Sequence, residues 1–158
     1  MKTSLRMDRE KAKELLSEVE LTATAQNSAE VRQRVVRLLN QVPTYNWVGI
    51  YLVKGNDLRL AAWAGPAPTV HTTIPIGKGV CGWAAKSGRT EIVSDVSKDS
   101  RYLECFSNTK SEIVIPIRFE GKVVGEIDID SDELNAHSSV DREFLEAVAA
   151  KIARHCVA

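Results

Sequence analysis

The sequence is short of several features that often reveal what a protein does. It has three cysteines, Cys81, Cys105 and Cys156, an odd number at wide spacing, which excludes a disulfide framework. Because there is no Cys-x-x-Cys pair, the cysteine spacing gives no indication of zinc. These observations favour a reducing, cytoplasmic compartment, and we expect neither a metal ion nor another cofactor.

The sequence also lacks an excess of charge of either sign. Its 21 basic and 21 acidic side chains cancel, whereas a nucleic-acid-binding surface usually carries a basic excess to neutralise phosphates. No apolar run approaches the roughly 20 residues that a membrane helix needs, and the charged start MKTSLRMDREKAKELL is unlike a signal peptide. We therefore expect a protein that binds neither nucleic acid nor membrane and is not exported.

What the sequence does contain is the patterning of one domain with a single core, which suits its 158 residues. Apolar positions at helical spacing predict helices over residues 8–21, 28–42, 80–86 and 138–156. We expect Ser28 to cap the second helix, Gly88 to end the short third one, and the capping-box pattern Ser138-x-x-Asp141 to open the last. β-Rich runs predict strands over residues 47–53, 57–64, 72–76, 90–93, 111–119 and 122–131.

This order of elements predicts an α+β fold. Residues 1–43 supply N-terminal helices, residues 44–135 a mainly antiparallel sheet with a pocket, and residues 138–156 the C-terminal helix. The terminal helices gather on one face of the sheet, and loops with the short helix cover the other. Because a loop as long as residues 65–79 is often a binding element in a compact domain, we expect a ligand pocket between it and the sheet.

A row of acids lies on one predicted strand. Alternation along VVGEIDIDS sends Glu126, Asp128 and Asp130 to one face, and Val123, Gly125, Ile127 and Ile129 to the other. The preceding strand is apolar at nearly every position, so it is expected to be covered on both faces. Acids beside such a strand either lie at its open, solvated end or meet a cationic group of a ligand.

Glu112 opens the partner strand of the same hairpin, so three carboxylates could converge at one end of the sheet. A strict two-residue turn at Glu120 and Gly121 would instead pair Ile113 with Asp128, so convergence requires a bulge or a different loop length. Close carboxylates repel one another, which raises at least one pKa and can keep a proton available. Such a cluster could hold an ammonium group or donate a proton.

The cysteines differ in their surroundings. Cys105 stands in an irregular polar stretch seven residues before Glu112, where it is either a reachable thiol or a half-buried apolar side chain. Cys81 lies between glycines in IGKGVCGWAA, which is typical of a small buried residue, and Cys156 is not expected to have a function.

Aromatic residues and one histidine are further candidates for the pocket. Trp47 and Tyr51 are four apart on a strand and share a face, so they wall a pocket or pack in a core. His71 in the long loop either lines the pocket or is solvated.

Together these segments resemble the free methionine-(R)-sulfoxide reductases, a family of stand-alone GAF domains. The matching segments are NWVGIY, IPIGKGVCG, the run from Cys105 to Ser111-Glu112, SEIVIPI and IDIDS. The resemblance implies a GAF fold and a cytosolic homodimer. It also implies that Cys105 is the catalytic cysteine, that Glu112, Asp128 and Asp130 are pocket acids, and that Trp47 and Tyr51 surround the thioether methyl.

The implied reaction is a thiol-dependent reduction. The Cys105 thiolate attacks the sulfoxide sulfur while an acid protonates the departing oxygen, methionine leaves, and Cys105 becomes a sulfenic acid. The family usually has a resolving cysteine ten residues before Cys81, where this chain has His71. Resolution would therefore use Cys81, Cys156 or an external thiol, with thioredoxin or a small thiol restoring the enzyme.

Two other functions fit the sequence. A non-catalytic GAF sensor domain, which binds a small molecule without turnover, agrees with His71 and with Phe106 at a position where the family usually has an acid. A dimerisation or scaffold domain would use the first and last helices but leaves the row of acids unexplained.

Overall fold

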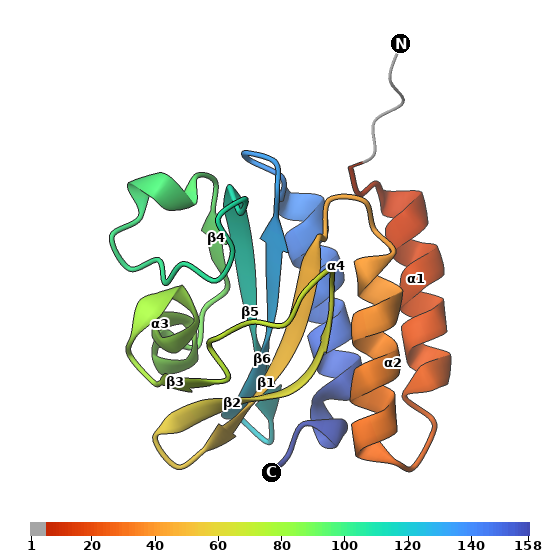
Figure 1. The fold of residues 1–158 in the computed structure, drawn as a ribbon. Helices are drawn as coiled ribbons and strands as arrows, with labels where there is room; N and C mark the ends of the chain where they lie inside the picture. The colour runs from red at the N-terminus through yellow and green to blue at the C-terminus, as the bar shows by residue number, and fades with distance from the viewer. Residues whose placement is uncertain (1–5) are drawn as a thin grey trace.

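The computed structural model describes residues 6–158 and shows a six-stranded antiparallel sheet between two unequal layers (Figure 1). The strand order is β3-β2-β1-β6-β5-β4, so β1 and β6 are the two central strands of the sheet. The elements are α1 (Arg9–Thr22), α2 (Ser28–Asn40), β1 (Trp47–Lys54), β2 (Asp57–Ala64), β3 (Thr73–Pro75), α3 (Gly79–Ser87), β4 (Glu91–Val93), β5 (Ser111–Phe119), β6 (Lys122–Ser131) and α4 (Ser139–Ile152). Short 3-10 turns cover Val96–Lys98 and Ala153–His155.

Helices α1, α2 and α4 form the layer on one face of the sheet, as the sequence predicts (Figure 1). Their apolar stripes meet the inward face of β1, β5 and β6 in one core that includes Val35, Leu39, Ile113, Ile127 and Leu145. Within residues 6–158, no helix is long and apolar enough to cross a lipid bilayer.

The helix boundaries follow their capping residues. Asp8 caps α1, and the predicted capping box opens α4, where Ser138 and Asp141 bond each other's backbone N–H groups. The predicted cap of α2, Ser28, is wrong by one residue. The cap is Asn27, whose side chain accepts a hydrogen bond from the N–H of Glu30, and Ser28 is already helical. Asparagine caps as well as serine does, so the choice between adjacent candidates depends on the backbone.

The opposite face of the sheet is covered by α3 and the segments around residues 65–72 and 94–110 (Figure 1). A second cluster of buried side chains lies between this layer and the sheet. It includes Val80 and Cys81 of α3 and Trp47, Tyr51 and Val114 of the sheet. The short helix α3 ends at Gly88, whose φ of 69° places it in the left-handed region that favours glycine.

The β5–β6 hairpin contains the bulge that convergence of the acids requires. Phe119 pairs with Lys122 around the two-residue turn, but the register then shifts, so that Ile117 pairs with Gly125 and Glu112 with Asp130. The extra residue is Val124, which packs against the helix-side core. The prediction that Val123 shares the face of Ile127 and Ile129 is therefore wrong, because the bulge reverses the alternation between them.

Candidate functional site

The row of acids lies on the face of the sheet away from the long helices. Asp128 is central: it is flanked by Val114 of β5 on one side and by Gly49 of β1 on the other. Glu112, Glu126, Asp128 and Asp130 are all at most 4% exposed. The prediction of a solvated edge is wrong, because α3 and the loops cover the acids.

Burial is the main cause that raises the pKa of each of these four carboxyl groups. Repulsion by Asp128 raises the pKa of Glu112, Glu126 and Asp130 further. For Asp128 itself, hydrogen bonds from Glu112 and Cys81 oppose the effect of burial. These effects favour the protonated form more strongly for Glu112, Glu126 and Asp130 than for Asp128.

Several polar atoms of the cluster have no hydrogen-bond partner among the described residues. They are both carboxylate oxygens of Glu126, both of Asp130, Oδ1 of Asp128 and the indole nitrogen of Trp47. Buried polar atoms in folded proteins are almost always paired. An unpaired set that consists mainly of carboxylate oxygens fits a cationic ligand group, such as a primary ammonium, which can donate three hydrogen bonds.

Trp47 and Tyr51 share the face of the acids, as predicted. Trp47 lies opposite Asp130 in the β1–β6 pairing, and Tyr51 lies opposite Glu126. The absence of a side chain on Gly49 leaves room for the Trp47 ring, because a Cβ there would overlap that ring. The Tyr51 hydroxyl donates to the carbonyl oxygen of His71 at 2.7 Å and so fastens the long loop to the sheet.

Cys105, His71, Cys81, Glu112 and Asp128 line one cavity, which Ile74, Val80 and Leu103 complete. The structure thus brings together one residue from the long loop, one from α3, two from the sheet, and the segment that carries Cys105. The volume of this cavity is about 10 Å³, room for about one water molecule. The site is closed in this conformation.

The thiol of Cys105 is half-buried, and its Sγ lies 3.5 Å from the carbonyl oxygen of Leu103. Burial raises its pKa to about 12, with a further rise from Asp128 and a lowering from the Thr69 hydroxyl. In the absence of a nearby cation, Cys105 is therefore a protonated thiol, because burial and the charge of the neighbouring carboxylates both disfavour the thiolate.

The segment that carries Cys105 is held at two points. Arg101 forms ion pairs with Asp99 at 2.8 Å and with Glu91 of β4 at 3.3 Å. Leu103 packs over Gly79, where a Cβ would lie 2.8 Å from Leu103 Cδ1.

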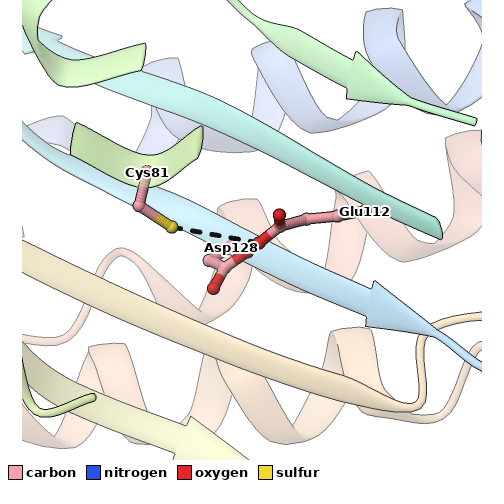
Figure 2. Close-up of side chains that lie close together, drawn as sticks. All are labelled: Cys81, Glu112 and Asp128. Atoms are coloured by element: carbon pink, nitrogen blue, oxygen red, sulfur yellow. Dashed lines mark hydrogen bonds between the residues drawn. The ribbon is translucent and has the colours of Figure 1, made fainter. Parts of the chain in front are cut away.

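Cys81 contacts the acids directly, as Figure 2 shows. Its Sγ lies 3.9 Å from Oε2 of Glu112, and the Asp128 side chain on β6 lies close to both. Burial and four nearby carboxyls raise the pKa of this thiol well above its usual value. Cys156 is buried in the helix-side core, so the sheet separates it from Cys105, which excludes it as the thiol that resolves a Cys105 sulfenic acid in this fold.

A second small cavity, of about 30 Å³, lies beside the first and is lined by Trp47, Phe106 and Asp130 among others. The rings of Trp47 and Phe106 are 5.8 Å apart between centroids. Sequence reasoning did not place Phe106, Leu103 or Thr69 at the site, because residues on an irregular segment have no periodicity that shows where they point. Glu126 was recognised as a member of the acid row but not as a site residue.

Comparisons with known proteins agree with this geometry. Residues 28–155 match the family model described as GAF domain. The chain is 42% identical over 116 residues to the free methionine-R-sulfoxide reductase of Saccharomyces cerevisiae, covering 71% of this chain and 63% of the yeast protein. It is 38% identical over 138 residues, 86% of each chain, to GAF domain-containing protein A of Dictyostelium discoideum.

A solved structure is similar over nearly the whole fold. The free methionine-R-sulfoxide reductase from Neisseria meningitidis, described in complex with its substrate, superposes with a TM-score of 0.86 at 30% identity, covering 98% of this chain and 95% of that one. The predicted GAF-like α+β fold is confirmed. The chain belongs to the GAF domain family.

Proposed function

We propose that this chain reduces free methionine-(R)-sulfoxide to methionine, with Cys105 as the nucleophile. The observation that carries the proposal is one closed cavity lined by two thiols and by the buried carboxyl groups of Glu112 and Asp128, of which Asp128 has an unpaired oxygen. A free amino acid sulfoxide matches it, since its ammonium group suits the carboxylates and its sulfur needs a thiol. The similarity to the Neisseria reductase covers 98% of this chain, and that to the yeast reductase covers 71% of it.

The proposed roles follow from position. Asp128 and Asp130 bind the ammonium group, with Glu112 beside them as the carboxylic acid that supplies a proton. Trp47 forms the apolar wall for the thioether methyl, and Tyr51 holds the loop that closes over it. His71 contributes to the wall of the cavity, with its Nε2 3.0 Å from the carbonyl oxygen of Glu104.

Burial is the main cause that keeps Cys105 protonated, and the ammonium group of the substrate removes a second one. Asp128 and Asp130 both raise the pKa of the Cys105 thiol, and a bound ammonium group neutralises their effect. The thiolate then attacks the sulfoxide sulfur, and protonation by a neighbouring carboxyl releases methionine. The S–O bond of the substrate breaks and its oxygen is transferred to the Cys105 sulfur, which becomes a sulfenic acid, so the thiol sulfur loses the two electrons that the sulfoxide gains.

Entry of the substrate requires movement, because the cavity has room for about one water molecule. The covering segments are residues 65–72, fastened by Tyr51, and residues 99–110, fastened by Arg101. Closure after binding excludes water from the reacting sulfur.

A pair of cysteine variants tests the nucleophile. Pre-reduced Cys105→Ser is expected to form no methionine in a single turnover, whereas Cys156→Ser, changed on the other face of the sheet, is expected to match the wild type. Full single-turnover activity of Cys105→Ser would contradict the proposed mechanism. Cys81→Ser is expected to retain this first reduction, because Cys81 is a candidate only for resolving the sulfenic acid.

One observation favours a second function, a GAF domain that binds a small molecule without converting it. Burial holds the pKa of Cys105 at about 12, and His71 stands where the family usually has its resolving cysteine. Such a domain would be stabilised by free methionine or its sulfoxide without consuming it. Thermal unfolding combined with product analysis separates the two functions.

The remaining expectations from the resemblance stay predictions: a homodimer, a cytoplasmic location, and thioredoxin or a small thiol as reductant. With Cys156 out of reach, only Cys81 and external thiols remain as partners for a Cys105 sulfenic acid.

A further inference from the structure

Three possible metal ligands converge at the floor of the cavity (Figure 2). The Sγ of Cys81 and carboxylate oxygens of Glu112 and Asp128 all lie within 4.8 Å of one another. Each of the three residues is at most 6% exposed. None of the ion pairs formed by residues 6–158 includes these carboxylates.

A second observation indicates that the cluster has capacity for a cation. Glu126 is fully buried, and both its oxygens lack a hydrogen-bond partner among the described residues. Oδ1 of Asp128 is likewise unpaired. Two buried acids, Glu112 and Asp128, therefore line a small cavity whose described lining contains no lysine or arginine.

The donor set selects the kind of cation. Two carboxylates alone would suit Mg²⁺ or Ca²⁺, but a thiolate shifts the preference towards thiophilic ions such as Zn²⁺. With Zn–S of about 2.3 Å and Zn–O of about 2.1 Å, tetrahedral ligands are about 3.6 Å apart. The separation of 3.9 Å between Cys81 Sγ and Glu112 Oε2 is close to that value.

We infer that Cys81, Glu112 and Asp128 form an inhibitory site for a thiophilic divalent cation of the zinc type, which excludes the ammonium group of the substrate. Three protein ligands leave a fourth position for water. Binding requires the thiolate and both carboxylates, so the metal displaces their protons into solvent. The ligands come from α3, β5 and β6, which is why cysteine spacing gave no indication of a metal. That the metal inhibits rests on the proposed function, whereas the site itself does not.

Cadmium is a direct probe because a Cd²⁺–thiolate bond has an ultraviolet charge-transfer absorption. Titration of fully reduced, desalted, full-length protein is expected to give this band with one equivalent of Cd²⁺, and Zn²⁺ is expected to abolish it by displacement. The band is expected to disappear in Cys81→Ser and Cys81→Ala and to persist in Cys105→Ser and Cys156→Ser. Glu112→Gln is expected to weaken Cd²⁺ binding at least tenfold, while Glu104→Gln, an exposed acid beside Cys105, leaves it unchanged.

Three results would overturn the site: no stoichiometric band in the wild type, a band that depends on Cys105 and persists in both Cys81 variants, or unchanged affinity in Glu112→Gln. Circular dichroism of each variant shows whether it is folded, and the Glu112→Gln comparison keeps the test decisive if the Cys81 variants fail to fold.

The effect on turnover is measured separately. In a single turnover without added thiol, Cd²⁺ is expected to slow methionine formation by the wild type, and more sulfoxide is expected to raise the Cd²⁺ concentration required. Inhibition that is independent of sulfoxide concentration would contradict competition with the substrate. A different result is stoichiometric Cd²⁺ binding by a protein that, kept metal-free with a chelator, forms no methionine. That result would contradict the proposed function but not the metal site.

Discussion

Glu112 on β5 lies directly opposite Asp130 on β6, two residues beyond the pair of Val114 and Asp128. This register depends on the bulge at Val124, since an unbroken hairpin would pair Ile113 with Asp128. Ile113 then stays in the helix-side core while Glu112 joins the acids on the opposite face. One extra residue near the turn thus determines which side chains form the pocket.

Replacement of Asp130 by asparagine separates binding from stability. Both Asp130 oxygens are buried and unpaired, so loss of the charge is expected to leave the thermal midpoint unchanged or higher. The KM for free methionine sulfoxide is expected to rise at least tenfold, because a charged hydrogen bond is worth roughly 1.5–3 kcal/mol. Steady-state kinetics check this, with exposed Asp132→Asn as the control, and an unchanged KM would remove Asp130 from the ammonium site.

Tyr51→Phe is expected to loosen the loop over the pocket. The substitution leaves the His71 carbonyl oxygen without the hydroxyl that donates to it at 2.7 Å, and the KM should rise. Tyr45→Phe is the matched control, because the Tyr45 hydroxyl donates to Asp141 at 2.6 Å on the helix side. Both should lose stability, by about 1–3 kcal/mol where a buried partner is left unpaired. Equal KM values for the two variants would contradict the role of Tyr51.

Gly79→Ala is expected to reduce turnover by moving the segment that carries Cys105. A Cβ at Gly79 would lie 2.8 Å from Leu103 Cδ1, and the φ of 71° adds backbone strain. Gly55→Ala has similar strain, with a φ of 60°, but its Cβ would contact nothing within 4 Å. Both variants should be destabilised, by roughly 1 kcal/mol or more, but only Gly79→Ala should lose turnover. Equal activity would show that Leu103 does not position the segment.

Acid is expected to destabilise the protein through His137. Burial lowers the pKa of His137 from 6.5 to about 4, with nearby Asp141 opposing and Arg6 adding to the effect. The unfolded chain therefore binds more protons between these values, so stability is full above about pH 6.5 and falls towards pH 4, by roughly 3 kcal/mol at most.

His137→Phe preserves a ring against Tyr45, which lies 5.8 Å away between centroids, and removes this titration. Denaturant unfolding at pH 7 and pH 5 checks the difference. Parallel losses of stability in the wild type and in the variant would exclude His137 as the cause.

Sequence reasoning predicted the elements of the fold and the face of the acids, because both depend on local periodicity. Apolar stripes and alternation are properties of neighbouring residues. Counting along the hairpin showed that convergence needs a bulge or a different loop length, and the structure has the bulge. It could not place Phe106 or Leu103, which lie on an irregular segment. It also missed the contact of Cys81 with Glu112, because that contact depends on how α3 packs against the sheet.

The most direct test is turnover of fully reduced protein with a mixture of both epimers of free methionine sulfoxide and excess dithiothreitol. We expect the R epimer alone to disappear, methionine to appear in equal amount, and Cys105→Ser to form none. Methionine no higher than in a reaction without protein would contradict the proposed reductase, as would equal consumption of the two epimers.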